Sequence, residues 1–211
     1  MTPKSILLVG AGGHAQACID VLEQAGRFTI LGLVGRPEEV GSQVLGYPVL
    51  GTDDDLPDLH AEASYALVTL GQIKTPVPRI RLFNQLQQLG FQLPVVISPQ
   101  AYVSRHAQVN IGTIVMHGAY VNAGAVVGRN CILNTKSLVE HNAVIGDHCH
   151  VSTAATVNGG VKVGDGVFLG SNSSLREMIC IAPGAIVGMG QTIRQDLAAD
   201  SPVVGELGAG R

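Results

Sequence analysis

Three of the seven histidines of this 211-residue chain lie within ten residues of one another, in the stretch VEHNAVIGDHCHVS. They are His141, His148 and His150. An imidazole can act as a general base near neutral pH, bind a metal ion, or stay solvated at the surface. Which of these roles applies depends on the element that carries the three rings and on what lies beside them.

The histidines belong to a six-residue repeat that runs without an insertion from Ile97 to Thr192. All sixteen units begin with Ile, Val or Leu, and the fifth position is small in nearly every unit. A helix with a 3.6-residue period cannot keep this pattern on one face, whereas short strands joined by turns can. The repeat therefore predicts a parallel β-helix over residues 97–198, with three six-residue sides in each coil and coils stacked at roughly 4.8 Å.

An eighteen-residue coil places His141 next to Gly159, because both occupy the third position of their units on the outer surface. His150 follows nine residues after His141, near the corner that leads to the next side. A base, a second imidazole and a backbone amide with no side chain in front of it are suited to acyl transfer. That reaction needs proton removal and a donor for the developing oxyanion.

The first ninety residues follow another pattern, in which strands alternate with helices around a glycine turn. This pattern predicts a small α/β domain over residues 1–92, about half of a Rossmann fold. The expected strands cover residues 5–10, 28–35 and 65–71, and the expected helices lie around residues 18–26 and 79–90.

The glycine turn GAGGHA contains Gly10, Gly12, Gly13 and His14 and precedes the first expected helix. Backbone amides at a helix N-terminus favour a phosphate or pyrophosphate group. A dinucleotide site would add an acidic residue at the end of the second strand, where this chain has Gly35, so NAD is not expected. A turn that serves close packing alone is the competing interpretation.

The segment EHNAVIGDHCHVS, with ILNTKS before it and NGGVKVGDGVFLGSNS after it, resembles the matching segment of bacterial sugar acyltransferases with hexapeptide repeats. That family includes UDP-4-amino-sugar N-acetyltransferases and the sialic acid O-acetyltransferase type. A half-Rossmann domain joined to a left-handed β-helix is the same family's organisation, so the likeness covers nearly the whole chain. The resemblance implies direct transfer of an acetyl group from acetyl-CoA to an amino sugar linked to a nucleotide.

The resemblance also implies roles for individual residues. His141 would be the general base, with Asn142 at a position where relatives usually carry Glu or Asp. His150 would contact the acetyl group of acetyl-CoA, and the amide of Gly159 would donate nearby. The remaining implied positions are Ser171, Gly188 and Gly190 for CoA, and Gly10, Gly12, Gly13, His14 and Asn134 for the nucleotide sugar.

Composition limits the partners. A net charge of −3 and a pI near 6.1, without a cluster of Lys or Arg, give no basis for binding nucleic acid. No apolar run is long enough to span a bilayer and no signal peptide is recognised, so a cytoplasmic location is expected.

The four cysteines form no CxxC pair and are expected to be buried free thiols. The family resemblance implies a homotrimer with acetyl-CoA between adjacent subunits, and residues 199–211 are expected to form a polar tail.

Three other functions stay open on the sequence. O-acetylation of a sialic-acid-like sugar would use the same site. A zinc enzyme resembling the β-helical carbonic anhydrases would take His117, His141 and His148 as ligands, although no metal is the main expectation. A sugar-nucleotide-binding trimer without catalysis would use the β-helix only to form the trimer. Apart from the zinc alternative, His106, His117 and His148 are expected to be ordinary solvated side chains.

Overall fold

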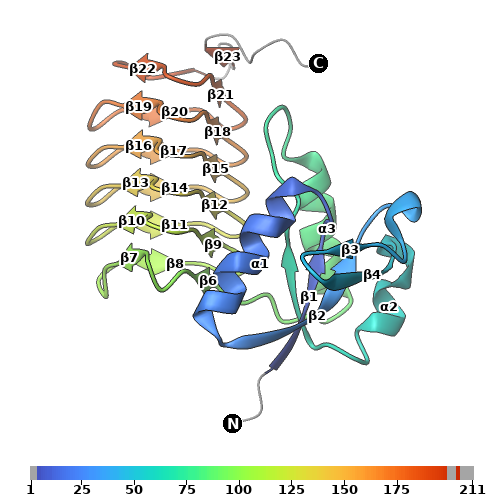
Figure 1. The fold of residues 1–211 in the computed structure, drawn as a ribbon. Coiled ribbons are helices and arrows are strands. Elements are labelled where there is room, and N and C mark those ends of the chain that lie inside the picture. Colours follow the sequence, from blue (N-terminus) through green and yellow to red (C-terminus); the bar gives the residue numbers. More distant parts are fainter. Residues whose placement is uncertain (1–3, 199–202, 205–211) are drawn as a thin grey trace. The chain divides into compact units, whose positions relative to one another are not determined.

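The structure is a computed structural model that describes residues 4–198 and 203–204 (Figure 1). The chain divides into two compact units. The first, here the α/β unit, comprises the residues up to Gly71 together with Val77–Pro99, and the second, the β-helix unit, comprises Gln72–Pro76 and the residues from Gln100 onward. The tail expected at 199–211 lies outside the described residues, apart from strand β23 (Val203–Val204). In the described part of the chain, no helix has the length and hydrophobicity needed to cross a membrane.

The α/β unit is built on a five-stranded sheet with the order β3-β4-β2-β1-β5. Strands β4, β2, β1 and β5 are parallel, and β3 pairs antiparallel with β4. The chain places β2 on one side of β1 and β5 on the other, so the direction of winding reverses at β1. Ligands of α/β folds bind beyond the carboxyl ends of the strands at such a point. The elements are β1 (Lys4–Val9), α1 (Gly13–Ala25), β2 (Phe28–Val34), η1 (Pro37–Glu39), β3 (Gln43–Val44), β4 (Tyr47–Gly51), η2 (Asp53–Asp55), α2 (Leu56–Leu59), β5 (Tyr65–Val68), α3 (Val77–Gln88) and β6 (Val96–Ile97).

The hairpin of β3 and β4 is not anticipated by the sequence pattern. Its two-residue turn consists of Leu45 and Gly46, with φ of 49° and 85°. Two successive positive φ angles are characteristic of the hairpin turns that match the twist of the strands. Leucine is an unusual residue at the first of these positions, so the turn lacks the Asn-Gly or Asp-Gly signal that normally reveals it.

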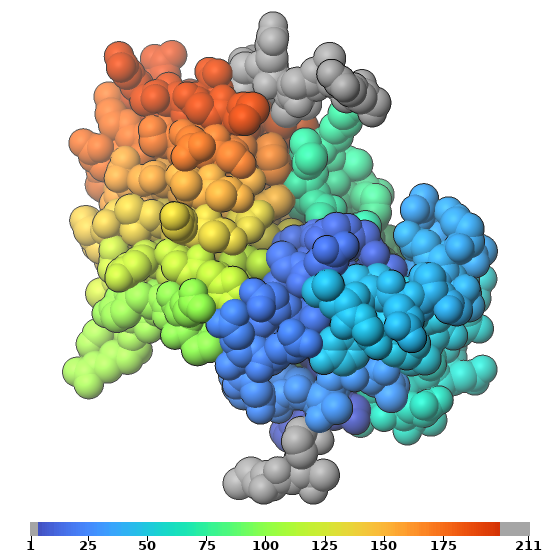
Figure 2. All heavy atoms as spheres, viewed as in Figure 1, coloured from blue at the N-terminus to red at the C-terminus, as the bar shows by residue number. Residues whose placement is uncertain are grey.

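The β-helix unit has the fold that the repeat and the family resemblance predict, a left-handed parallel β-helix (Figure 1). Paired strands are one coil apart, as in Leu138↔Thr156 and Val144↔Lys162, and successive coils form the colour bands of Figure 2. The first sheet contains β7 (Tyr102–Val103), β10 (Tyr120–Val121), β13 (Leu138–Val139), β16 (Thr156–Val157), β19 (Ser174–Leu175) and β22 (Thr192–Ile193). The second contains β8 (Gln108–Val109), β11 (Val126–Val127), β14 (Val144–Ile145), β17 (Lys162–Val163) and β20 (Cys180–Ile181). The third includes β9 (Ile114–Val115), β12 (Ile132–Leu133), β15 (His150–Val151), β18 (Phe168–Leu169), β21 (Ile186–Val187) and β23.

The turns between the sheets explain why the repeat is rich in Gly and Asn. The fourth position of many units has a positive φ, for example 53° at Asn130, 58° at Asn142 and 75° at Gly124. Glycine reaches this conformation without strain, and asparagine reaches it more easily than most residues. Stacked turns form three edges: the first edge joins the first sheet to the second and carries His141, the second edge carries His148, and the third edge carries His117.

The interior is filled by the first and fifth positions of the units. Val139 and Val157 are fully buried first positions, and Cys131 and Cys149 stack as buried fifth positions. Burial raises the pKa of the Cys149 thiol well above its ordinary value. The expectation of a buried thiol is wrong for Cys180, which is exposed because it occupies the outward sixth position of its unit.

This difference in burial predicts selective thiol chemistry. Burial raises the pKa of Cys18 to about 12, so this thiol, like that of Cys149, stays protonated and unreactive at pH 8. Iodoacetamide at pH 8 is expected to modify Cys180 alone in the native protein, as read by intact mass and peptide mapping. All four cysteines should react in denaturant, and modification of a second cysteine in the native protein would contradict the burial described above.

Candidate functional site

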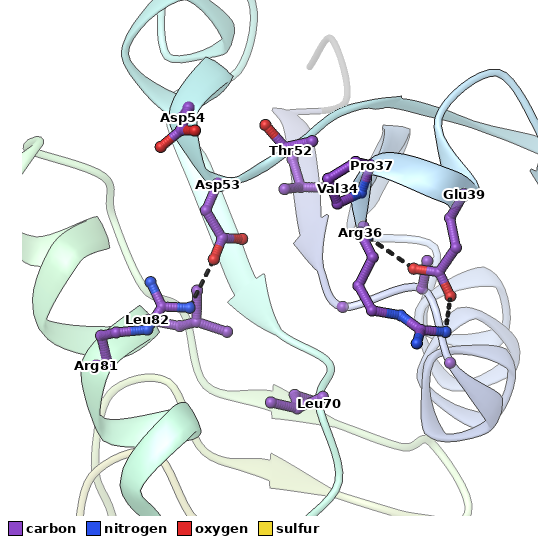
Figure 3. Close-up of a pocket in the computed structure, with 14 residues that line it drawn as sticks. Val34, Arg36, Pro37, Glu39, Thr52, Asp53, Asp54, Leu70, Arg81 and Leu82 are labelled. Carbon is purple, nitrogen blue, oxygen red and sulfur yellow. Dashed lines mark hydrogen bonds and ion pairs between the residues drawn. The ribbon is translucent and has the colours of Figure 1, made fainter.

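The α/β unit has a cavity of about 610 Å³ at the carboxyl ends of its parallel strands (Figure 3). Its position agrees with the reversal of winding at β1. A nucleotide-sized ligand fits a cavity of this volume. The lining residues are Gly10, Ala11, Gly12, Val34, Gly35, Arg36, Pro37, Glu39, Thr52, Asp53, Asp54, Leu70, Arg81 and Leu82.

Gly10 has a structural reason to be glycine. Its φ is 121°, and a Cβ atom at this position would lie 2.8 Å from the backbone nitrogen of Leu70. Its carbonyl also accepts a 2.7 Å hydrogen bond from Thr69 Oγ1. The glycine turn thus packs against the end of β5, which agrees with a packing role, and it also lines the cavity, which agrees with a ligand role.

The other predicted residues of the loop differ from Gly10. Gly12 lines the cavity, and a Cβ atom there would have no atom within 4 Å. Gly13 and His14 form the first turn of α1 and are not among the lining residues. The structure therefore brings Gly10 and Gly12 to the cavity and leaves Gly13 and His14 outside its lining.

Alanine substitutions at Gly10 and Gly12 are expected to differ in their effect on stability. Gly10→Ala is expected to lower the free energy of unfolding by about 1–3 kcal/mol, because the new methyl group meets backbone that cannot move aside. Gly12→Ala is the matched control, since its φ of −78° and open surroundings tolerate a methyl group. Its cost should stay within about 0.5 kcal/mol. Urea unfolding of both variants measures the difference, and equal stability of the two would contradict the close approach at Gly10.

Two ion pairs flank the cavity on opposite sides (Figure 3). Arg36 contacts Glu39 at 3.1 Å, and Arg81 contacts Asp53 at 2.6 Å. The hydrogen bond from Arg36 is the main reason that the pKa of Glu39 lies below its usual value. Both guanidinium groups are partly exposed, so they can also meet the negative charge of a phosphate.

Several lining residues were missed from the sequence. They are Glu39 in η1, Thr52 before η2, Asp53 in η2 and Arg81 in α3, and no linear motif joins them. One signal could have found part of this set: the run TDDD follows strand β4, and residues after parallel strands converge at the carboxyl edge of a sheet.

The first edge of the β-helix unit carries the predicted base. The backbone nitrogen of Gly160 bonds the carbonyl of His141 at 3.0 Å, which fixes the two coils in register. A Cβ atom on Gly159 would lie 2.6 Å from Cε1 and 2.7 Å from Nε2 of the His141 ring. The imidazole therefore occupies the space that a side chain at position 159 would fill, and the sequence-predicted juxtaposition is present.

Asn142 and Glu140 flank His141 in the chain. Asn142 Nδ2 lies 3.3 Å from His141 Nδ1, and a carboxylate oxygen of Glu140 accepts a 3.2 Å hydrogen bond from the His141 backbone nitrogen. The exposed imidazole opens onto a cavity of about 430 Å³. Its lining residues are Glu140, His141, Asn158, Gly159, Glu177 and Met178.

His150 lies apart from His141, at the start of β15 in the third sheet. The ring is buried and stacks edge-on against Phe168, with 5.3 Å between ring centroids. Asn134 Oδ1 accepts the backbone N–H of Thr135, so its Nδ2 faces His150 Nε2 at 3.2 Å. His150 Nδ1 must then carry the proton and donate it to the carbonyl of Gln72, 2.7 Å away.

The remaining predicted residues follow the third edge. The backbone carbonyl of Ser171 accepts a 2.8 Å hydrogen bond from the backbone nitrogen of Gly190, one coil later. Gly188 stacks on Gly170, one coil earlier. Asn134 lies on the same edge and directly follows the third-sheet strand β12. Within one chain, the predicted base and the predicted CoA-contacting residues thus occupy two different edges of the prism.

A zinc site finds no support within one chain. His117, His141 and His148 lie on three different edges, and residues 4–198 contain no group of three potential metal ligands. His148 instead lies with Nδ1 3.0 Å from Asn130 Nδ2.

Comparisons with known proteins find one matching family model and several similar solved structures. Residues 5–86 match the family described as the PglD N-terminal domain. A variant of perosamine N-acetyltransferase from Caulobacter crescentus, solved with CoA and GDP-perosamine, is 32% identical to the chain with a TM-score of 0.87, covering 92% of this chain and 90% of that one. The acetyltransferase domain of PglB from Neisseria gonorrhoeae is 28% identical with a TM-score of 0.85, covering 93% and 94%. WeeI from Acinetobacter baumannii, at 19% identity and a TM-score of 0.71 over 90% and 94%, shares the fold. A comparison with curated protein sequences gives no match.

Proposed function

Because the chain belongs to the hexapeptide-repeat sugar acyltransferases, we propose that it transfers an acetyl group from acetyl-CoA to the amino group of a nucleotide-linked sugar. The observation that carries this proposal is the packing of the His141 ring against the bare coil at Gly159. The relative solved with CoA and GDP-perosamine supports the choice of donor and acceptor.

In the proposed reaction, His141 accepts a proton from the sugar nitrogen as that nitrogen attacks the thioester carbonyl carbon. The new C–N bond forms while the carbonyl electrons move to oxygen, which the Gly159 amide stabilises. The C–S bond then breaks, and His141 returns the proton to the CoA sulfur. The products are the N-acetylated sugar and free CoA, with no acyl-enzyme.

Asn142 has a specific part in this scheme. For Nε2 to accept a proton, Nδ1 must carry one and needs an acceptor. Turning the Asn142 amide by 180° places its oxygen where the nitrogen now lies, 3.3 Å from Nδ1. Asn142 then orients the ring and fixes its tautomer, although it supplies no negative charge.

We place the nucleotide in the cavity of the α/β unit and the CoA groove on the third edge of the β-helix unit. Because the base lies on the first edge, a complete site then needs the first edge of one subunit against the third edge of the next. This requirement supports a homotrimer. Light scattering should accordingly give the mass of three 21.9 kDa chains.

Release of free thiol from acetyl-CoA tests the proposed function. The acceptor panel contains UDP-, GDP- and CMP-linked amino sugars, GDP-perosamine among them, and the products are identified by their mass. At least one acceptor is expected to gain an acetyl group at an enzymatic rate. Absence of turnover with every acceptor, by protein shown to bind a nucleotide sugar, would instead support the binding-only alternative.

A further inference from the structure

The cavity beside His141 is lined by negatively charged residues and by no Lys or Arg. Two carboxylates, Glu140 and Glu177, line it, and its other lining residues are His141, Asn158, Gly159 and Met178. None of these six carries a fixed positive charge. Neither carboxylate forms an ion pair with any residue among 4–198, so both remain available to a ligand.

The stacking of three coils sets the two carboxylates around the reacting position. The backbone nitrogen of Gly160 bonds the carbonyl of His141, and that of Met178 bonds the carbonyl of Gly159, each at 3.0 Å. Glu177 therefore lies two coils from His141 with Gly159 between them. The backbones of these two coils are roughly 9.6 Å apart, and the imidazole of His141 lies over Gly159 between them. Both His141 and Glu177 line the cavity of about 430 Å³, which is large enough for an amino group on a sugar ring.

Other charged side chains near this edge do not cancel the carboxylates. Arg105 occupies the same column two coils on the opposite side of His141, and its Nε bonds His106 Nε2 at 3.1 Å. Arg176 precedes Glu177 in the chain but does not line the cavity. Among the residues of one chain that line the cavity, the fixed charges are therefore both negative.

We propose that Glu140 and Glu177 select an amine over a hydroxyl as the acceptor. This inference rests on the proposed function of the same edge. An amino sugar arrives largely as the ammonium ion and releases one proton to water before it reacts. Its nitrogen becomes positive again when it attacks the thioester carbon, and His141 takes the second proton. Carboxylates stabilise both cationic forms through charge-assisted hydrogen bonds. A hydroxyl group is neutral when it binds, so it gains much less from the two charges.

Paired acceptors test this selection. GDP- and UDP-linked 4-amino-4,6-dideoxyhexoses are compared with the same nucleotides carrying a 6-deoxyhexose, whose 4-hydroxyl group replaces the amine. In Glu177→Gln and Glu140→Gln, kcat/KM for the amine is expected to fall on the order of ten- to a hundredfold. The inhibition constant of the hydroxyl analogue should change by less than about twofold. Glu177→Asp keeps the charge and should recover most of the loss, and exposed Glu62, replaced by Gln, serves as the matched control.

Two results would overturn the selection: full amine turnover in both Gln variants, or an equal loss for amine and hydroxyl ligands. Thermal melting confirms that each variant is folded. A failure of the proposed function looks different, because then the wild-type protein releases no thiol with any acceptor, or His141→Ala keeps its activity. The selection fails alone when His141→Ala is inactive and the Glu177→Gln and Glu140→Gln variants retain full preference for the amine.

Discussion

His141→Ala is expected to lower kcat for acetyl transfer by on the order of 10² or more, with a much smaller change in KM for acetyl-CoA. The imidazole contacts the bare coil at Gly159 and opens onto the cavity, where it can reach a reacting nitrogen. It is exposed and holds no buried partner, so its removal should leave the melting temperature nearly unchanged. Steady-state kinetics with the acceptor found in the panel measures the effect.

His148→Ala is the control for this experiment. His148 lies on the second edge and should keep activity within about threefold of the wild-type value. A zinc mechanism that uses both rings would make the two variants equally inactive. Retained activity in His141→Ala would remove the proposed base, and zinc content per subunit would then decide for or against the metal mechanism.

Gly159→Ala is expected to reduce kcat by about 10²-fold without unfolding the protein. The new methyl group would lie within 2.7 Å of two atoms of the His141 ring, so the ring must rotate away. Because the obstacle is the end of an exposed side chain, rotation costs little stability. It does, however, move the base away from the amide that is proposed to stabilise the oxyanion. Kinetics and thermal melting on the same sample test both halves of this prediction.

Ala123→Gly provides the counterpart on the other side of His141. Ala123 occupies the same column one coil earlier, where its carbonyl accepts the backbone N–H of Asn142 at 3.2 Å. Removing its methyl group should change kcat by less than about threefold. A large effect at Ala123, or none at Gly159, would show that the ring does not depend on the bare coil for its position.

The β-helix could be predicted in detail because its register follows from counting. A six-residue period without insertions fixes which residues stack, so the pairing of His141 with Gly159 and the burial of Cys131 follow from sequence alone. In the α/β unit, strands β1, β2 and β5 and the glycine turn could be predicted from the sequence pattern, whereas the hairpin of β3 and β4 could not. The cavity of this unit was only half predictable, because Thr52, Asp53 and Arg81 come from separate elements that meet only after folding.

Two features show why the rest of the site could not be predicted from the sequence alone. The carbonyl of Gln72 fixes the tautomer of His150, although the two residues are far apart in sequence and no periodic pattern relates them. Glu177 lies in the column of His141, two coils later, but the cavity that the two residues line is evident only in the structure. Backbone periodicity predicts which residues are neighbours, whereas hydrogen bonds between unrelated segments depend on tertiary packing.

The insertion-free repeat has a consequence for how such a chain tolerates change in length. Loss of eighteen consecutive residues from one end of the β-helix shortens it by one coil and leaves every remaining side chain on its original face. Loss of six residues between His141 and Gly159 shifts all later residues by one third of a turn, which would carry Gly159 away from His141 while the hydrophobic interior stays intact. Loss of whole coils from an end should therefore preserve the chemistry, and loss of a single hexad between these two residues should yield a folded but inactive protein.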